Sequence, residues 1–330
     1  MSLRLKVFLV VAALLGLALV VVTAGAVARR LRDGQAIEIH RPESVVALAF
    51  SPSGDVLLSL EGDPSHWART VQGSREPSGV PLGPVAKMKG GAMDLAVSRE
   101  NVLGVSQESG SVTLHSLPKG EPIGELPGYG TYGNQFSAPS SVRFSPTGRL
   151  AAAYGVSGRL YVWDLSRRSL QWSRECRGWL GFVFEDAVAF VSTSSSIRVE
   201  SLSTRSLVTE LALDPDVVWC HALSPRGTIL VSYPWEAPFK ASPRSLPSGK
   251  PAGEPLATAP HDRIAFSDDD ALVAVVGPET LSILEVATGR SVFFTSFPRR
   301  VDASSVVFSP TRNRLAVARD TTIHVFVFRR

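Results

Sequence analysis

The chain has 330 residues, of which 44% are hydrophobic, enough for a sizeable core, and its formal net charge is +4. Five of its 34 lysines and arginines lie in residues 1–32, which hold no acid, so residues 33–330 carry 29 basic and 30 acidic side chains. The positive excess therefore belongs to the N-terminal segment. It gives no support for nucleic-acid binding by the rest of the chain, and we expect no nucleic-acid partner.

An uncharged apolar segment occupies residues 7–28, bounded by Lys6 and Arg29. A helix of that length rises about 33 Å, which is enough to cross the core of a bilayer. A charged side chain at the centre of such a helix costs about 2.5 to 3.5 kcal/mol, so the two charged boundaries mark membrane edges. We predict that residues 1–32 form one transmembrane anchor whose residues 7–28 contact the lipid bilayer.

A cleaved signal peptide is the alternative for this segment, because Ala26-Val27-Ala28 fits a small-x-small cleavage site. The protein would then be secreted or periplasmic. Basic residues on both sides of the apolar segment leave the orientation of a retained anchor open. We expect a single-pass membrane protein whose main part is extracytoplasmic, because an anchor and a signal peptide would then share one insertion path.

A repeated pattern follows the leader through residues 33–330. Each copy contains short runs of β-branched and apolar residues separated by turn residues, which predicts four hairpin-linked strands. The residues that end the first strand of each copy lie 39 to 47 residues apart, a spacing that predicts the blades of a propeller. These seven markers are Phe50, Val97, Phe144, Phe184, Leu223, Phe266 and Phe308.

Residues 140–173 form the clearest copy. They contain the turn Ser145-Pro146-Thr147-Gly148 and a strand that ends in Trp163-Asp164. This copy resembles a WD-repeat. Val156-Ser157-Gly158 stands where a buried aspartate often precedes the third strand of that family, so we expect its usual side-chain network to be missing here. The resemblance implies an all-β fold, a seven-bladed β-propeller of four-stranded antiparallel blades, preceded by one N-terminal hydrophobic helix.

Closure of the ring is expected from residues 34–40. This segment alternates apolar and polar residues but has no partner in its own repeat, whereas the last repeat supplies only three strands before the chain ends. As in WD-repeat propellers, residues 34–40 would complete the last blade. Residues 33–330 would then form one domain.

Catalytic motifs and metal-ligand spacings are missing from the sequence, and we predict no catalytic, cofactor-binding or metal-binding residue. The six histidines fall in different repeats, and Asp268-Asp269-Asp270 is interpreted as a solvated turn. Cys176 and Cys220 are interpreted as small buried or half-buried residues, although a single bridge between them stays open. We therefore predict that the protein is not an enzyme, and we predict no small-molecule substrate.

Three long connections carry aromatic residues and emerge on one face of the predicted ring. They are residues 61–68, 127–139 and 232–242. Exposed loop aromatics often anchor protein partners, although they could instead fold back over the rim. The candidate protein-binding residues are Trp67, Tyr129, Tyr132, Phe136, Tyr233, Trp235 and Phe239.

These features predict a membrane-tethered, non-enzymatic scaffold for protein–protein interaction, whose partners the sequence does not identify. The role depends largely on the resemblance, because a fold hosts many functions. The alternative is an exported propeller enzyme or small-ligand binder that uses the central channel. That alternative requires convergent polar side chains at the mouth of the channel.

Overall fold

A computed structural model describes residues 36–62, 68–76, 78–107, 111–127, 139–155, 158–193, 196–213, 219–234, 240–259, 262–311 and 313–329. The predicted anchor, residues 1–32, lies outside these ranges. Within them, no helix has the length and apolarity needed to cross a membrane.

The described residues form antiparallel β-sheets, five with four strands and one with seven. The strands of the seven-stranded sheet are β2 (Ser44–Phe50), β3 (Val56–Gly62), β4 (Ala68–Arg75), β5 (Val80–Val97), β6 (Val102–Gln107), β7 (Val112–Ser116) and β8 (Glu121–Leu126). The strands of the four-stranded sheets are β9 (Pro139–Phe144), β10 (Leu150–Gly155), β11 (Arg159–Asp164) and β12 (Ser169–Glu175); β13 (Gly178–Val183), β14 (Ala187–Thr193), β15 (Ser196–Ser201) and β16 (Leu207–Ala212); β17 (Trp219–Leu223), β18 (Ile229–Pro234), β19 (Lys240–Ser245) and β20 (Leu256–Ala257); β21 (Arg263–Phe266), β22 (Leu272–Val276), β23 (Thr280–Glu285) and β24 (Ser291–Ser296); and β25 (Ser305–Phe308), β26 (Arg314–Arg319), β27 (Thr322–Val327) and β1 (Ile37–His40).

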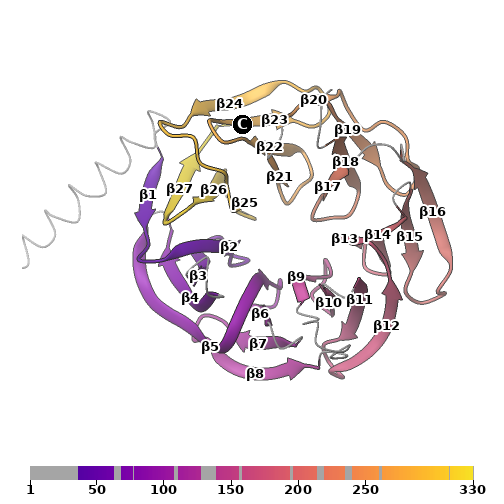
Figure 1. Cartoon of the computed structure of the whole chain (residues 1–330), viewed down its shortest axis with the longest axis horizontal. Coiled ribbons are helices and arrows are strands. Elements are labelled where there is room, and N and C mark those ends of the chain that lie inside the picture. The colour runs from indigo at the N-terminus through magenta and orange to yellow at the C-terminus, as the bar shows by residue number, and fades with distance from the viewer. Residues whose placement is uncertain are drawn as a thin grey trace, which may run out of the picture.

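The sheets stand around a common axis like the blades of a propeller (Figure 1). Strands β9, β13, β17, β21 and β25 lie nearest the axis, and the last strand of each sheet lies at the perimeter (Figure 1). The seven-stranded sheet contains the strands of two such units, because β5 takes part in both. Its first half pairs with β4, as in Val71↔Ala86, and its second half pairs with β6, as in Leu95↔Val105.

The outermost strand of one sheet comes from the opposite end of the chain. Strand β1 pairs antiparallel with β27 in the register Ile37↔Val325 and Ile39↔Ile323. Ile39 is buried in a cluster with residues of both β27 and β2. The beginning and the end of the described chain are thus joined in one sheet, so the ring of sheets is closed by hydrogen bonds and by apolar packing.

The core lies between the sheets. Among the described residues, the buried apolar side chains form seven clusters, each built from neighbouring sheets or, in one case, from the two units of the seven-stranded sheet. Trp163, at the end of β11, is buried against β7 and β10, and its indole N–H has no hydrogen-bond partner within the described ranges. Each sheet is covered on both faces, which explains the nearly continuous apolar runs of strands such as β22 and β26.

A serine begins most of the turns between the first and second strands of each unit. These serines are almost fully buried: Ser51, Ser98, Ser145, Ser224, Ser267 and Ser309. In Ser145, the backbone N–H donates to Leu150 O at 3.0 Å and the side-chain oxygen accepts from Leu150 N at 3.1 Å. These hydrogen bonds therefore fix the turn that joins the innermost strand of each unit to the second strand.

One predicted repeat marker is placed differently by the structure. Phe184 lies in the turn between β13 and β14 and is 48% exposed, whereas Phe182 is buried in the strand and pairs with Val188. In the preceding sheet, Phe144 pairs with Ala151 in the same way, so Phe182 is the residue that corresponds to Phe144. The turn of this unit is short, so the sequence pattern assigned the marker to Phe184, two residues after the correct residue, Phe182.

Candidate functional site

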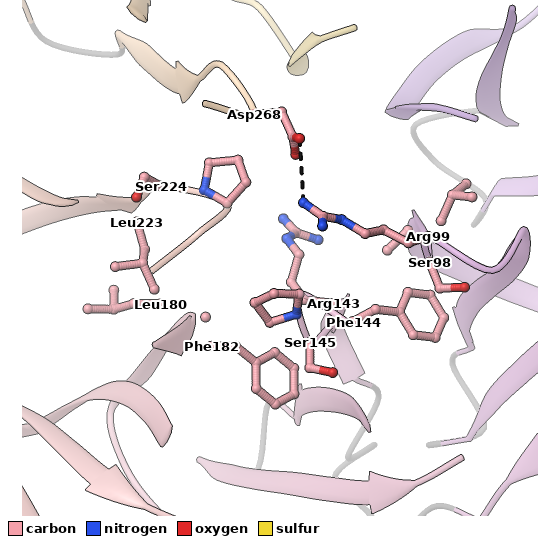
Figure 2. Close-up of a pocket in the computed structure, with 15 residues that line it drawn as sticks. Ser98, Arg99, Arg143, Phe144, Ser145, Leu180, Phe182, Leu223, Ser224 and Asp268 are labelled. Atoms are coloured by element: carbon pink, nitrogen blue, oxygen red, sulfur yellow. Dashed lines mark ion pairs between the residues drawn. The ribbon is translucent and has the colours of Figure 1, made fainter. Parts of the chain in front are cut away.

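A cavity of about 270 Å³ opens at the centre of the ring. Its walls come from the inner strands β5, β9, β13 and β17 and from the turns that follow three of them, and the turn after β21 adds Asp268. Because these turns join first to second strands, the opening lies on the face opposite the ends of β3, β8 and β18, which lead into the predicted aromatic loops. We call this opening the hub mouth (Figure 2).

Two arginines point into the hub mouth, one from the turn after β5 and one from β9 (Figure 2). Arg99 Nη2 lies 3.5 Å from the Asp268 carboxylate on the other side of the opening. Arg143 Nη1 donates to Asp94 Oδ2 and to Val142 O, both at 2.6 Å. The arginine side chains are 58% and 52% exposed, so solvent reaches both guanidinium groups.

The wall beside these charges is apolar. It is formed by side chains of β9, β13 and β17, namely Phe144, Leu180, Phe182 and Leu223 (Figure 2). Phe182 is buried and packs in the cluster between β10 and β14. The hub mouth thus combines cationic groups with a preformed apolar wall, which is a combination suited to a ligand that has one acidic and one apolar group.

Hydrogen bonds between neighbouring turns hold the walls in place. Glu185 accepts from Ser145 Oγ at 2.9 Å and from Thr147 N at 3.0 Å, which joins the turn after β13 to the turn after β9. Asp270 accepts from Ser224 Oγ at 2.9 Å and from Thr228 Oγ1, which joins the turn after β21 to the turn after β17. Because each contact crosses from one sheet to the next, the rim of the hub mouth is rigidly organised.

Phe184 lies in the turn after β13 in an unusual conformation. Its φ of +55° is uncommon for a bulky residue, yet its ring is about half exposed. The next turn approaches it closely, since a Cβ added at Gly227 would lie 2.4 Å from Phe182 O and 2.8 Å from Phe184 N. The neighbouring elements thus fix the backbone at Phe184 while its ring stays accessible.

Six of the seven predicted protein-binding residues lie outside the described residues: Trp67, Tyr129, Tyr132, Phe136, Trp235 and Phe239. The three connections that carry them join β3 to β4, β8 to β9 and β18 to β19. The seventh, Tyr233, is the last residue but one of β18 and is only 8% exposed. Its hydroxyl donates to Asp262 O at 3.2 Å, so Tyr233 packs in the core and is not an exposed anchor.

Burial shifts the pKa of some titratable groups elsewhere in the ring. Burial lowers the pKa of His221 to about 4, and this ring lies 3.0 Å from Ser232 Oγ. Cys176 is a free buried thiol, and burial raises its pKa to about 11. The described residues contain no group of three His, Cys, Asp or Glu side chains that could hold a metal ion.

Sequence reasoning missed Arg99, Arg143 and Phe184 as site residues. Two of them depart from the repeated Ser-Pro-x-Gly turn: Arg99 follows the serine where proline is usual, and Phe184 takes a left-handed position usually held by glycine. These departures were visible in the sequence. That the two arginines meet at one opening, beside the strand that leads to Phe184, could be read only from the closed ring.

Residues 120–164 match the family described as WD domain, G-beta repeat. The matched segment begins at the turn before β8 and ends with Asp164, the last residue of β11. It therefore spans the outer strand of one unit and the first three strands of the next. No curated protein matches the chain.

Proposed function

We propose that the chain is a seven-bladed propeller that acts as a non-enzymatic scaffold for protein–protein interaction. WD-repeat proteins typically have this role, and residues 120–164 match one such repeat. The seven-blade count is supported by the seven apolar clusters and by the double use of β5. In the matched segment, the outer strand of one blade precedes the three inner strands of the next blade. The pairing of β1 with β27 has the same offset, because β1 is the outer strand of the last blade and precedes the first blade in the chain.

The observation that carries the proposal is the set of turns fixed around the hub mouth. Glu185 ties the turn after β13 to the turn after β9, and Asp270 ties the turn after β21 to the turn after β17, so four of the turns form a fixed frame. A partner that binds such a frame loses little conformational entropy to ordering the scaffold. The six undescribed loop aromatics remain the predicted second surface, on the opposite face of the ring.

We further propose that residues 7–28 tether the protein to a membrane, with the propeller on the outer side. The proposal is supported by the length of that uncharged segment and by its charged boundaries. After alkaline carbonate extraction, the full chain should stay with the membranes and a chain lacking residues 1–32 should not. Release of the full chain by carbonate would reject the tether, and protease resistance of the propeller in intact cells would reject the outward orientation.

Proximity labelling from the intact chain tests the scaffold role, because it reports neighbours and compartment together. Proteins enriched by labelling are then tested for direct capture. Replacing Trp67, Tyr132 and Trp235 with Ala should abolish capture by the loop face while the melting temperature stays unchanged. Undiminished capture by this triple variant rejects the loop face, and a lack of reproducible neighbours for the unaltered chain rejects the scaffold role.

Use of the central channel by a small ligand is the second candidate. The cavity of about 270 Å³ at the hub mouth favours it, because that volume is close to the lower end for small-molecule sites. Both arginines there are more than half exposed, whereas a catalytic or small-ligand site usually encloses its polar groups. We therefore favour the scaffold.

A further inference from the structure

We infer that the hub mouth binds an acidic segment of a protein partner, with one carboxylate held by Arg99 and Arg143 and one apolar side chain placed on the wall beside them. This inference deepens the proposed scaffold function and rests on it. It assigns to the face opposite the loop aromatics a partner of defined chemistry.

The charges at the opening support an anionic ligand. Two guanidinium groups point into one cavity (Figure 2). Among the described residues that line it, Asp268 carries the one carboxylate, and Asp94, which is not a lining residue, pairs with Arg143 at 2.6 Å. Arg143 is bound through Nη1 to Asp94 and Val142 O, which leaves its outer edge toward the opening. Each guanidinium already has a carboxylate neighbour, but both are more than half exposed, so their free N–H groups together offer a ligand carboxylate more donors than either group alone.

The chain already contains a substitute for the ligand carboxylate. Asp268 reaches Arg99 from the opposite side of the opening, at a distance of 3.5 Å. Its side chain is 38% exposed, and an exposed ion pair of this length contributes little to stability. A partner carboxylate can therefore replace Asp268 at small cost, and Asp268 acts as an internal competitor.

The apolar part of the ligand is specified by the wall and by the turn after β13. Leu180, Phe182 and Leu223 line the cavity next to the arginines. Phe184 is not one of the lining residues, but it lies in the turn directly after β13 and has an exposed ring, held by a backbone conformation that glycine would adopt more easily. Backbone strain at an exposed aromatic residue is a feature of functional sites, and aromatic side chains often anchor interfaces.

A nucleic acid or another polyphosphate fits these observations less well. Residues 33–330 carry 29 basic and 30 acidic side chains, so this part of the chain has no net positive charge. Phosphate backbones are bound by many basic groups along a track, whereas this opening has two basic groups beside an apolar wall. One carboxylate next to one apolar group is the better match.

Two blocked dipeptides test the chemistry on the full-length chain. Acetyl-Phe-Glu-amide carries the required carboxylate, and acetyl-Phe-Gln-amide differs from it only in charge. Titration calorimetry should show that the glutamate peptide binds about fivefold more tightly, the ratio expected for one exposed ion pair. Equal affinities for the two peptides, or no binding of either, would overturn the inference.

Variants of the two charged residues identify the site. Arg99→Gln should remove the preference for the glutamate peptide. Asp268→Asn should tighten binding of that peptide by about two- to fivefold, because it removes the internal competitor. A merely structural role of Asp268 predicts no such gain, so unchanged or weaker binding by Asp268→Asn contradicts the inference.

Phe184→Gly tests whether the exposed ring of Phe184 takes part in binding, without the usual risk of unfolding. Glycine accepts a φ of +55° freely, so the melting temperature should be equal or higher while both peptides bind more weakly. Arg205→Gly is the matched control, since Arg205 has the same φ in the turn between β15 and β16, away from the hub mouth. Equal effects of the two glycine variants on binding would count against a role of the Phe184 ring.

The two proposals fail in different ways. If the peptides do not bind but proximity labelling recovers partners that the chain captures directly, the scaffold function stands and this inference falls. If the peptides bind as expected but no protein partner is found, the chemistry of the hub mouth stands and the protein ligand is rejected.

Discussion

Residues in the left-handed backbone region decide how the sheets meet at the hub. Gly54, Gly148 and Gly227 hold this conformation in three of the first turns, whereas Asn101 and Asp270 hold it in two others. Asparagine and aspartate tolerate a positive φ better than most residues, and their side chains can also bond locally. At Asp270 the structure uses this freedom to direct a buried carboxylate into the neighbouring turn.

Substitution of Asp270 should show that this carboxylate joins two sheets. Asp270→Ala removes the acceptor for Ser224 Oγ and Thr228 Oγ1 and also disfavours the positive φ. Since hydrogen bonds to a charged group contribute about 1.5 to 3 kcal/mol, we expect the free energy of unfolding to fall by about 3 kcal/mol. Chemical denaturation measures this change. Asp269→Ala is the control for bonds within one turn, because Asp269 accepts from Ser267 Oγ and Ala271 N of its own turn, and it should cost clearly less.

The pH dependence of stability should reflect His221. Its pKa is lowered to about 4 by burial, whereas an unfolded histidine titrates near 6.5. Between these values the unfolded state binds the additional proton, so stability falls as the pH falls from about 6.5 toward 4. At pH 5 the loss should be about 2 kcal/mol relative to pH 8.

His221→Gln isolates this contribution to the pH profile. The variant should show a flatter dependence of the free energy of unfolding on pH between 6.5 and 5 than the unaltered chain. The remaining slope is expected from His115 and His324, whose pKa values are also lowered by burial. An identical slope in the variant would show that His221 does not remain neutral in the folded state.

At the scale of elements, closure depends on β1 and on the residue that follows it. Strand β1 supplies four paired residues to β27, and Ile39 is buried between β27 and β2. Arg41, directly after the strand, lies 3.1 Å from Glu61 of β3 and donates to Ser74 of β4. The chain therefore passes from the sheet that contains β27 to the sheet that contains β3 and β4, and Arg41 binds the second sheet directly after β1 ends.

Weakening β1 should reduce stability out of proportion to its length. Deletion of residues 33–40 is expected to lower the melting temperature sharply, because it removes a strand and exposes the hydrogen-bonding edge of β27. Ile39→Ala should cost about 2 to 5 kcal/mol, as for other buried large-to-small changes. The matched control is Glu38→Gln on the exposed face of the same strand. An unchanged melting temperature after the deletion would show that the pairing of β1 with β27 does not stabilise the ring.

At the scale of the whole molecule, the closed ring predicts coupling between distant sheets. Cys176 lies between β12 and β13, in a cluster that involves none of the closing strands β1 and β27. Its thiol is buried and its pKa is raised to about 11, so the folded protein should react slowly with a thiol reagent.

Labelling of Cys176 in a Cys220→Ser background tests whether the ring opens as a unit. If it does, Ile39→Ala should accelerate labelling by roughly the factor by which it destabilises the whole chain, because labelling follows the population of the opened state. Glu38→Gln should leave the rate unchanged. A normal rate in Ile39→Ala would show that the sheet containing β1 opens locally.

The sequence by itself determined the repetition. Alternating runs, serine turns and the spacing of the first strands predicted antiparallel units, because strand periodicity and turn chemistry are local properties of the chain. It also placed residues 34–40 as a strand without a local partner. The shortened turn at Phe184 misled the assignment, since the register of one hairpin is set by its paired neighbour and is not visible in a single strand.

Only the tertiary structure decided which residues meet. Arg99 and Asp268 are far apart in the chain and come together because the ring returns to its axis after each sheet. Tyr233 resembled an exposed loop aromatic, but a neighbouring sheet buries its ring and accepts its hydroxyl hydrogen bond. Contacts between sheets depend on the closed arrangement of all of them, so local sequence patterns carry no record of the hub mouth.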